Sequence, residues 1–328
     1  MEKREDIMAI ARAFMRSRII LTAAELDLFT HIQQGVASAG ALSERLNLDR
    51  RALTRVLDCL VNFDLLEKKD GTYSLSAEGA FFSSMHPASS LPMLLHMNAL
   101  WDGWSGLSGI VRMGAESKQK TPVAMAPEAR KAFIGAMHVV GRSLSEDVAA
   151  SLDLGGFRKL MDIGGGSGTY TIAFLKRNPK MGAVLFDLPE VVLMARERFE
   201  SEGVLGRAAT VAGDFYKDEL PQGCDVALLS AIIHQNSRAQ NVDLYRKIFR
   251  AIDTGGMIVI RDHVMDERRV WPPEGALFAI NMLVNTRGGD TYTFAEIEED
   301  LKDAGFQEIR MVRTGERMDS LVTAVKPK

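Results

Sequence analysis

Residues 160–168 read Leu-Met-Asp-Ile-Gly-Gly-Gly-Ser-Gly, and they give the clearest indication of the fold. Its apolar first half predicts a short buried strand, and the residues after Ile163 form a glycine-rich loop. The segment that follows Gly168 has a helical pattern. A strand, a glycine-rich loop and a helix in this order are typical of a parallel α/β sheet, and they predict a ligand site at the loop.

The sequence on both sides continues this alternation of short apolar strands and helices. Alternation of this kind predicts the α/β class, with a doubly wound, Rossmann-like parallel sheet. The predicted strands lie at 158–163, 183–188, 209–214, 225–230 and 257–262. The predicted closing elements are helices at 275–286 and 294–306 and strand-like segments at 308–314 and 320–326.

Polar residues stand at the predicted carboxyl end of every one of these five strands. In an open parallel sheet, ligands bind beyond the carboxyl ends of the strands. One Asp at a strand end carries little information, because Asp is common in turns. Repetition at neighbouring strands predicts a functional edge. The four acidic ends are Asp162, Asp187, Asp214 and Asp262, while the remaining strand ends at Ser230 and is followed by His234.

The spacing of the loop glycines bears on the cofactor. A dinucleotide fingerprint, GxGxxG, would continue from Gly164 and Gly166 to a glycine at 169, where the chain has Thr169. The spacing is instead GxGxG, ending at Gly168, with Asp162 just before it. Glycines let the backbone approach a ligand closely, and Asp162 offers negative charge to an ammonium or a sulfonium. This arrangement suits a cofactor whose bound end is an amino acid.

The next strand ends supply groups for the rest of such a cofactor. Asp187, with Leu188 beside it, is placed to accept hydrogen bonds from a ribose diol. Asp214 offers an acceptor for an exocyclic amine, and Phe215 an aromatic face for adenine. Ser230, at the end of the following strand, is also predicted to contact the cofactor. Together with the loop, this set indicates S-adenosylmethionine.

The first ninety residues are predicted as helices followed by a small hairpin. Ser38 and Asp49 are expected to cap helices, and Asp70-Gly71 predicts a tight turn. This order is a winged-helix pattern, which often binds DNA. However, residues 1–90 carry 11 basic against 12 acidic side chains, and DNA binding depends on neutralising phosphates. We therefore expect a structural or dimerising domain, with DNA binding as the alternative.

Residues 91–150 are predicted as mostly helical, with a polar, proline-containing interruption at 114–130. The methionines and tryptophans of this helical segment suit the wall of a pocket for a flat ligand, although apolar residues at helical spacing can also belong to the hydrophobic core alone. Two asparagines one helical turn apart in the 275–286 helix share a face, which indicates substrate recognition or an internal hydrogen bond. The predicted substrate contacts are Met97, Trp101, Met137, His138, Asn281 and Asn285.

The composition excludes several classes of protein. The chain has 328 residues, 46% of them hydrophobic, and a formal charge of −3, which favours two ordinary globular domains over a nucleic-acid-coating protein. Only Cys59 and Cys224 occur, far apart, so a disulfide framework or a structural zinc site is not expected. We see no apolar run of the ~18 residues that span a bilayer. A cytoplasmic protein is the simplest prediction.

Five segments carry a family resemblance, in this order along the chain. They resemble the plant caffeate-type and bacterial hydroxyindole-type small-molecule O-methyltransferases. The resemblance covers nearly the whole chain and implies a metal-independent homodimer. It implies a dimerisation domain at 1–90, a helical connector and pocket wall at 91–150, and a catalytic domain at 151–328. The segments are LMDIGGGSG (160–168), LFDLPEV (185–191), GDFYKDELP (213–221), LLSAIIHQN (228–236) and GGDTYTFAEIEEDLKDAGF (288–306).

The resemblance assigns roles by position. It makes His234 the general base, Asp262 one of two acids that flank the base, and residues at the glycine loop and the next strand ends the cofactor contacts. The chain departs from the family at three places. Gln235 stands where an Asp often follows the base, Ser230 where plant enzymes have a Lys, and Thr291 where the second flanking acid is expected. The carried-over cofactor contacts are Gly164, Asp187, Asp214 and Phe215.

The expected reaction is methyl transfer to a phenolic or enolic hydroxyl of a small molecule. A phenol, with a pKa of ~10, is a poor nucleophile until a base such as His234 takes its proton. The departures keep N- or C-methylation, non-methylating chemistry and a cofactor-sensing DNA-binding regulator open as alternatives. His263 next to Asp262 raises the question of a metal site, which we reject because adjacent residues on a strand point to opposite sides.

A dimer is also predicted from the first helix. Residues 9–32 are expected to form a helix that is apolar on more than one face. Such a surface exceeds what one small domain covers and calls for a second copy of the chain. The apolar positions in this expectation are Ile19, Ile20, Leu21, Ala24, Leu26, Leu28 and Phe29.

Overall fold

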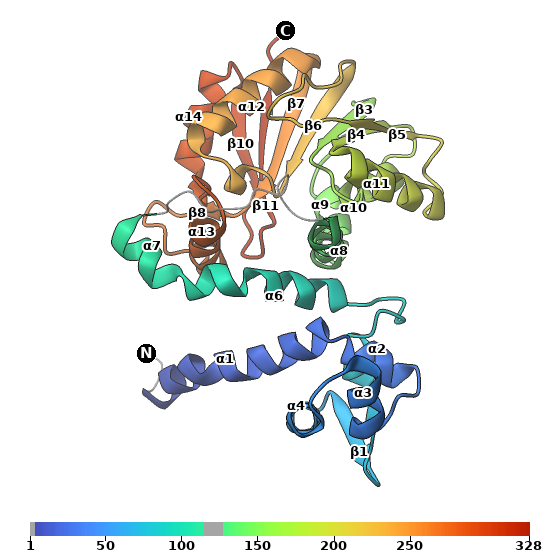
Figure 1. Cartoon of the computed structure of the whole chain (residues 1–328). Helices are drawn as coiled ribbons and strands as arrows, with labels where there is room; N and C mark the ends of the chain where they lie inside the picture. Colours follow the sequence, from blue (N-terminus) through green and yellow to red (C-terminus); the bar gives the residue numbers. More distant parts are fainter. Residues whose placement is uncertain (1–3, 115–126) are drawn as a thin grey trace. The chain divides into compact units, whose positions relative to one another are not determined.

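The computed structural model of the protein describes residues 4–114 and 127–328 (Figure 1). Most of the predicted polar interruption at 114–130 lies outside these residues. The chain divides into two compact units. The first comprises Met1–Trp101 and Ala126–Val139, and the second comprises Asp102–Met125 and Val140–Lys328.

The first unit has the predicted order of helices and a small hairpin. Ser38 and Asp49 cap two of its helices through side-chain oxygens that accept from Ala41 N and Ala52 N, at 3.1 and 2.7 Å. Asp70 starts the left-handed turn that joins the two strands. The winged-helix prediction is confirmed for this segment. The elements are α1 (Arg4–Glu25), α2 (Leu28–Gln33), α3 (Ala39–Leu46), α4 (Arg50–Asn62), β1 (Leu66–Lys69), β2 (Thr72–Leu75), α5 (Ala77–Ala80), and most of α6 (Leu91–Ser105) and α8 (Pro127–Arg142).

The prediction of one continuous helix over 9–32 is wrong. Helix α1 ends at Glu25, and Asp27 adopts a left-handed conformation with φ of 50°, so the chain turns before α2 begins. The turn directs Leu28 and Phe29 into the unit's own core, where both are 0% exposed. Helical periodicity carries no signal for this break, because the apolar spacing continues across it.

The argument for a dimer from these residues is therefore wrong as well. Leu21 and Ala24 pack in a buried cluster with Leu91 and Leu94 of α6, and the other predicted positions are buried or half-buried within the unit. The exposed apolar surface of α1 lies nearer its start, where five side chains are between 46% and 62% exposed. They are Ile7, Met8, Ile10, Phe14 and Met15.

The second unit is built on a seven-stranded sheet in the order β10-β11-β7-β6-β3-β4-β5. All five predicted central strands occur and run parallel, and β11 and β10 complete one side antiparallel. The α/β prediction is confirmed. The strands are β3 (Lys159–Ile163), β4 (Gly182–Asp187), β5 (Ala208–Ala212), β6 (Cys224–Ser230), β7 (Ile252–Asp262), β10 (Gln307–Arg313) and β11 (Ser320–Val325).

Helices cover both faces of this sheet (Figure 1). One face packs against α9 (Ser145–Ala150), α10 (Thr169–Arg177) and α11 (Pro189–Ser201). The other packs against α12 (Arg238–Ala251) and α14 (Phe294–Asp303). The remaining elements of the unit are α7 (Leu107–Met113), η2 (Ile233–Gln235), α13 (Pro273–Asn285) and the short parallel pair β8 (Val264–Met265) and β9 (Tyr292–Thr293).

The strand order positions the site. The chain leaves β3 through α10 toward β4, whereas β6 lies on the other side of β3, so the connections diverge between β3 and β6. Ligands of open parallel sheets bind where connections diverge in this way. Among the described residues, no helix is long and apolar enough to span a membrane.

Candidate active site

The glycine-rich loop closes tightly onto its neighbours. Gly164 and Gly168 have φ of 68° and 78°, a left-handed region that favours glycine, and Gly168 caps α10. A Cβ at Gly164 would lie 2.5 Å from Ile232 Cδ1, and one at Gly168 would lie 2.5 Å from Phe199 Cε1. The backbone is therefore held at the carboxyl edge of the sheet with no room for larger residues.

Asp162 lies beneath this loop, one residue before the end of β3 rather than at its end as predicted. It is buried, and Thr171 Oγ1 donates to its Oδ2 at 2.5 Å. Its Oδ1 is buried without a hydrogen-bond donor among the described residues. Burial raises the pKa of Asp162 to about 6. A buried acceptor without a donor is costly, so this oxygen suits a ligand that brings a cationic N–H.

Asp187 ends β4 as predicted and ties the loop to that strand. Its Oδ2 accepts from Gly166 N at 2.8 Å, and its Oδ1 accepts from Leu188 N at 2.7 Å. A carboxylate oxygen can accept more than one hydrogen bond, so Asp187 can also accept from ligand hydroxyls.

Asp214 lies two residues beyond the end of β5. Its Oδ1 accepts from Tyr216 N at 3.0 Å, and its Oδ2 lies 3.0 Å from the ammonium of Lys217. The ring of Phe215 lies over the loop, with Cε1 3.5 Å from the position of a Cβ at Gly164. The structure thus brings the loop, Asp187 and Phe215 together, as the sequence predicts.

A histidine and a carboxylate meet at the ends of β6 and β7. His234 Nδ1 lies 2.9 Å from each carboxylate oxygen of Asp262, and the two residues are 8% and 1% exposed. Burial alone would raise the pKa of Asp262, but His234 beside it leaves that pKa below its ordinary value. No described residue hydrogen-bonds to Nε2 of His234. A proton on Nδ1 donated to Asp262 makes Nε2 the acceptor nitrogen.

Helix α13 packs against this pair through Phe278, a residue that was not among the predicted site residues. The ring of Phe278 packs edge-on against the His234 ring, with 4.8 Å between the ring centroids, and its centroid lies 5.4 Å from that of the His263 ring. His263 is buried, its Nδ1 has no partner among the described residues, and burial lowers its pKa. The missed signal was spacing, because Phe278 precedes Asn281 and Asn285 by three and seven residues on one helical face.

The two asparagines of α13 hydrogen-bond to each other and to Trp104, which lies in the last turn of α6 and belongs to the same unit. Asn281 Oδ1 accepts from Trp104 Nε1 and from Asn285 Nδ2, each at 3.0 Å. Asn285 Nδ2 also lies 2.9 Å from the backbone oxygen of Asn281. These contacts match the internal-hydrogen-bond alternative, and substrate recognition by the pair stays a prediction.

Four predicted substrate contacts belong to the first unit. Trp101 packs against the cluster of Leu21 and Leu91, with the guanidinium of Arg18 5.4 Å from its ring centroid. Met97 is exposed, and Met137 and His138 are half-buried. Contact of these side chains with a substrate stays a prediction.

Ser230 ends β6 as predicted, but its partner was not expected. Its Oγ accepts from Nε of Arg261, the residue before Asp262, at 2.7 Å. Arg261 is buried in spite of its charge. An arginine inside the predicted strand 257–262 was a signal available in the sequence.

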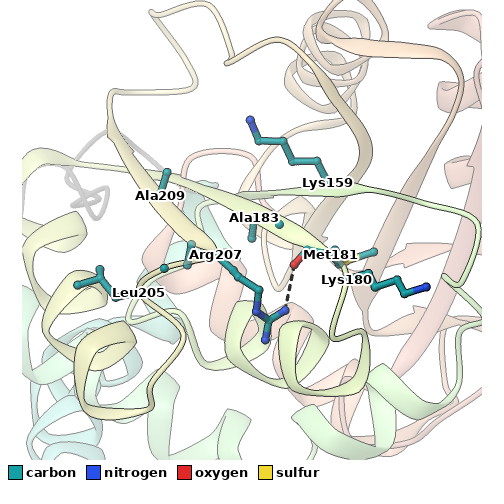
Figure 2. A pocket seen from close by; sticks show the side chains of 10 residues that line it. Lys159, Lys180, Met181, Ala183, Leu205, Arg207 and Ala209 are labelled. Atoms are coloured by element: carbon teal, nitrogen blue, oxygen red, sulfur yellow. Dashed lines mark hydrogen bonds between the residues drawn. The ribbon is translucent and has the colours of Figure 1, made fainter.

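A cavity of about 430 Å³ lies at the opposite edge of the sheet (Figure 2). It is lined by residues at or near the starts of β3, β4 and β5, including Lys159, Lys180 and Gly182. The guanidinium of Arg207 donates to three carbonyl oxygens, among them Met181 O at 3.0 Å. The cavity is at the amino ends of the strands, so we do not assign the active site to it.

Comparison with known proteins assigns the family. Residues 118–307 match the O-methyltransferase domain, and residues 8–84 match the O-methyltransferase dimerisation domain. The chain belongs to the O-methyltransferase family.

Individual relatives agree with this assignment. The 3-hydroxy-5-methyl-1-naphthoate 3-O-methyltransferase of Streptomyces sahachiroi is 32% identical, over 93% of this chain and 90% of its own. The acetylserotonin O-methyltransferase of Gallus gallus is 28% identical, over 96% of both chains. The structure of human N-acetylserotonin methyltransferase in complex with SAM superposes with a TM-score of 0.81 at 24% identity, covering 100% of this chain and 99% of that one.

This methyltransferase uses S-adenosylmethionine, and the residues at the carboxyl edge of its sheet fit that cofactor. The unpartnered buried oxygen of Asp162 complements a cationic amino group. The backbone of the glycine-rich loop leaves no space for side chains at the same place. The predicted family and cofactor are therefore confirmed, while the roles of individual residues remain predictions.

Proposed function

We propose that this methyltransferase acts on a phenolic or enolic hydroxyl of a small aromatic molecule, with His234 as the general base. The observation that carries the proposal is the buried contact of His234 Nδ1 with both oxygens of Asp262. Asp262 orients the imidazole, fixes the tautomer with Nε2 unprotonated, and stabilises the imidazolium that forms when Nε2 takes the substrate proton.

The proton transfer explains why the pair matters. Bound S-adenosylmethionine supplies an electrophilic methyl group on a sulfonium. A phenol attacks such a group slowly while it keeps its proton, because its pKa is ~10. An imidazole within hydrogen-bond reach of the hydroxyl removes the proton as the new bond forms, which contributes roughly 10²–10⁴-fold in rate.

Other residues at the edge would hold the two reactants in place. The loop backbone and Asp162 would bind the amino-acid end of the cofactor, Asp187 its ribose, and Asp214 with Phe215 its adenine. Holding both reactants in line supplies much of the acceleration of a displacement reaction. Phe278 and the asparagines of α13 lie next to His234 or on the same helix face, where they can contact an acceptor.

An aromatic acceptor is supported by the relatives. One is named for methyl transfer to a hydroxynaphthoate and another for acetylserotonin. We also propose that the chain works as a homodimer, because residues 8–84 match a dimerisation domain.

The test uses methyl-labelled S-adenosylmethionine with a panel of phenols, quinols, hydroxyindoles and amines. We expect label on a hydroxyl of at least one aromatic compound. We expect His234→Gln to lower kcat about 10²–10⁴-fold while the cofactor product binds as to wild type. Asp243→Asn, an exposed change on α12, serves as the control and should retain wild-type rates.

Two results would contradict the proposal. Labelling of amines or carbons alone would favour N- or C-methylation. A His234→Gln variant with nearly full activity would show that this residue does not remove the proton.

A further inference from the structure

Arg261 is a buried cation without an ion-pair partner. It is 4% exposed, and among the described residues no carboxylate oxygen lies within 4.0 Å of its guanidinium. Nε donates to Ser230 Oγ at 2.7 Å and Nη1 donates to Met318 O at 2.8 Å, while Nη2 faces Met318 Sδ at 3.8 Å. The carboxylates of Asp162 and Asp262 interact electrostatically with Arg261, but neither makes a direct ion pair with it. A buried guanidinium whose direct contacts are all neutral is unfavourable, so this residue calls for an explanation.

The sheet register places Arg261 on the same face as Asp162. Asp162 pairs with Leu228 across β3 and β6, and Ser230 pairs with Arg261 across β6 and β7. Side chains two residues apart on a strand point the same way, so Asp162, Ser230 and Arg261 share the face that packs against α10. Tyr170 of α10 completes the group, with its ring 4.6 Å from the guanidinium carbon.

Asp162, Tyr170 and Arg261 together have both hydrogen-bond acceptors and hydrogen-bond donors without partners among the described residues. Asp162 Oδ1 and the Tyr170 hydroxyl are buried without partners among the described residues. A guanidinium has five N–H donors, and the three contacts of Arg261 leave one N–H on each terminal nitrogen. An acceptor with negative charge, two cationic donors and a hydroxyl together complement a zwitterion.

We propose that Arg261 binds the α-carboxylate of the cofactor's amino-acid end, with the Tyr170 hydroxyl donating to the same carboxylate and Asp162 accepting from the α-ammonium. Arg261 and Asp262 are consecutive residues at the end of β7, so their side chains point to opposite faces of the sheet. In this proposal Arg261 binds the cofactor on one face, while Asp262 contacts His234 on the other.

A purely structural role is the competing explanation. Through Met318, Arg261 also links β7 to the segment between β10 and β11. If that link were its whole role, replacing Arg261 would weaken every ligand alike. A carboxylate contact instead predicts a loss that depends on the ligand's carboxylate.

The experiment is a thermodynamic double-mutant cycle in which the protein and the ligand are each changed. Calorimetry measures the affinity of each protein for each ligand. The ligands are S-adenosylhomocysteine and its decarboxylated form, which keeps the amine and lacks only the carboxylate. We expect wild type to prefer the intact ligand about 10- to 100-fold, as for a charged hydrogen bond, and Arg261→Met to bind both ligands with nearly equal affinity.

Arg313→Met is the matched control, because Arg313 lies on β10, which β11 separates from β7, and already pairs with Asp319 at 2.6 Å. It should keep the wild-type preference. Arg261→Lys keeps the charge and should keep part of the preference, and Tyr170→Phe should also reduce it. These two variants carry the test if Arg261→Met does not fold.

The proposal is overturned if wild type binds the two ligands equally, or if the Arg261 variants weaken both ligands by one factor and keep the preference. Neither readout involves methyl transfer. Tight binding of S-adenosylhomocysteine without the expected preference would refute the role of Arg261 and leave the proposed function of His234 intact.

Discussion

Among the residues that the structure describes, Asp262 is the one acidic partner of His234, and this follows from two substitutions relative to the family pattern. Thr291 stands where the second flanking acid is expected, and its hydroxyl donates to the backbone oxygen of Gly275. Gln235 replaces the acid after the base and is neutral. Orientation of the imidazole therefore depends on Asp262, whose carboxylate is held in turn by the backbone N–H of His263 at 2.8 Å.

Asp162 links cofactor binding to pH. Burial raises its pKa to about 6, from 3.8 for an ordinary Asp. Only the ionised carboxylate attracts an ammonium, so the affinity for S-adenosylhomocysteine should fall as pH decreases through about 6, approaching tenfold per unit below it. Calorimetry between pH 5 and 8 measures this slope.

The same shift has a stability consequence of opposite sense. With a folded-state pKa above the unfolded value, the folded chain binds more protons between about pH 4 and 6, so stability falls as pH rises through this window. Asp162→Asn should therefore raise the Tm at pH 7 by about 3–6 °C, with a smaller gain at pH 4, while weakening cofactor binding. A lower Tm for Asp162→Asn at pH 7 would contradict the account.

For single residues, the sequence predicts which side chains lie at the strand ends. It does not predict contacts that depend on the register between neighbouring strands. The placement of Asp187, His234 and Asp262 at one edge was predicted because carboxyl ends of parallel strands meet there. Arg261 and Tyr170 were missed because their contact depends on which strand faces align and how α10 packs. A single sequence without a register does not contain that information.

At the scale of elements, the glycine-rich loop and α10 act as one piece. Gly168 caps the helix, and the helix supplies Thr171 to Asp162 and Tyr170 to Arg261. The first turn of α10 thus carries contacts for the predicted cofactor site. Any change that moves the start of this helix should disturb both contacts together.

Gly168→Ala tests this coupling. The new Cβ would lie 2.5 Å from the fully buried Phe199 ring, in a backbone conformation with φ of 78°. We expect a loss of stability of about 2–4 kcal/mol and a marked loss of affinity for S-adenosylhomocysteine.

Gly203→Ala is the matched control. Its φ of 69° is similar, but no atom outside Gly203 and its two chain neighbours lies within 4 Å of the new Cβ. It should cost only the backbone term of about 1–2 kcal/mol and leave cofactor binding unchanged. Equal effects of the two variants, by thermal unfolding and calorimetry, would show that packing on Phe199 is unimportant.

Element boundaries show where prediction from pattern fails. The strands of the sheet were predicted because short apolar runs alternate regularly with helical stretches along the chain. The break between α1 and α2 was missed, because it depends on one left-handed residue, Asp27, inside an unbroken apolar pattern. That one turn decides whether Leu28 and Phe29 face the core or solvent.

At the scale of the whole molecule, the break in the first helix changes the argument for assembly. The apolar side chains after Ile19 are used within the first unit. What remains uncovered is the start of α1. Ile7, Ile10 and Phe14 are spaced by three and four residues, so they form one stripe along the helix. A stripe of this kind on a chain whose residues 8–84 match a dimerisation domain indicates contact with a second copy.

Changing this stripe to charge should separate the dimer. We expect wild type to sediment as a dimer at micromolar concentration, and Ile10→Glu combined with Phe14→Glu to sediment as a monomer. Helical circular dichroism should be retained, because both side chains are more than half exposed in the isolated chain. Two buried carboxylates facing their copies across a two-fold interface would repel and lose hydration.

Leu193→Glu controls for adding charge to any exposed apolar site. Leu193 lies on α11 in the second unit, is 61% exposed and is as apolar as the α1 residues. A dimer that survives Leu193→Glu and not the α1 double variant assigns assembly to the stripe. If wild type is itself a monomer, or if the double variant stays dimeric, the stripe does not hold two copies together, and the dimer requires another surface.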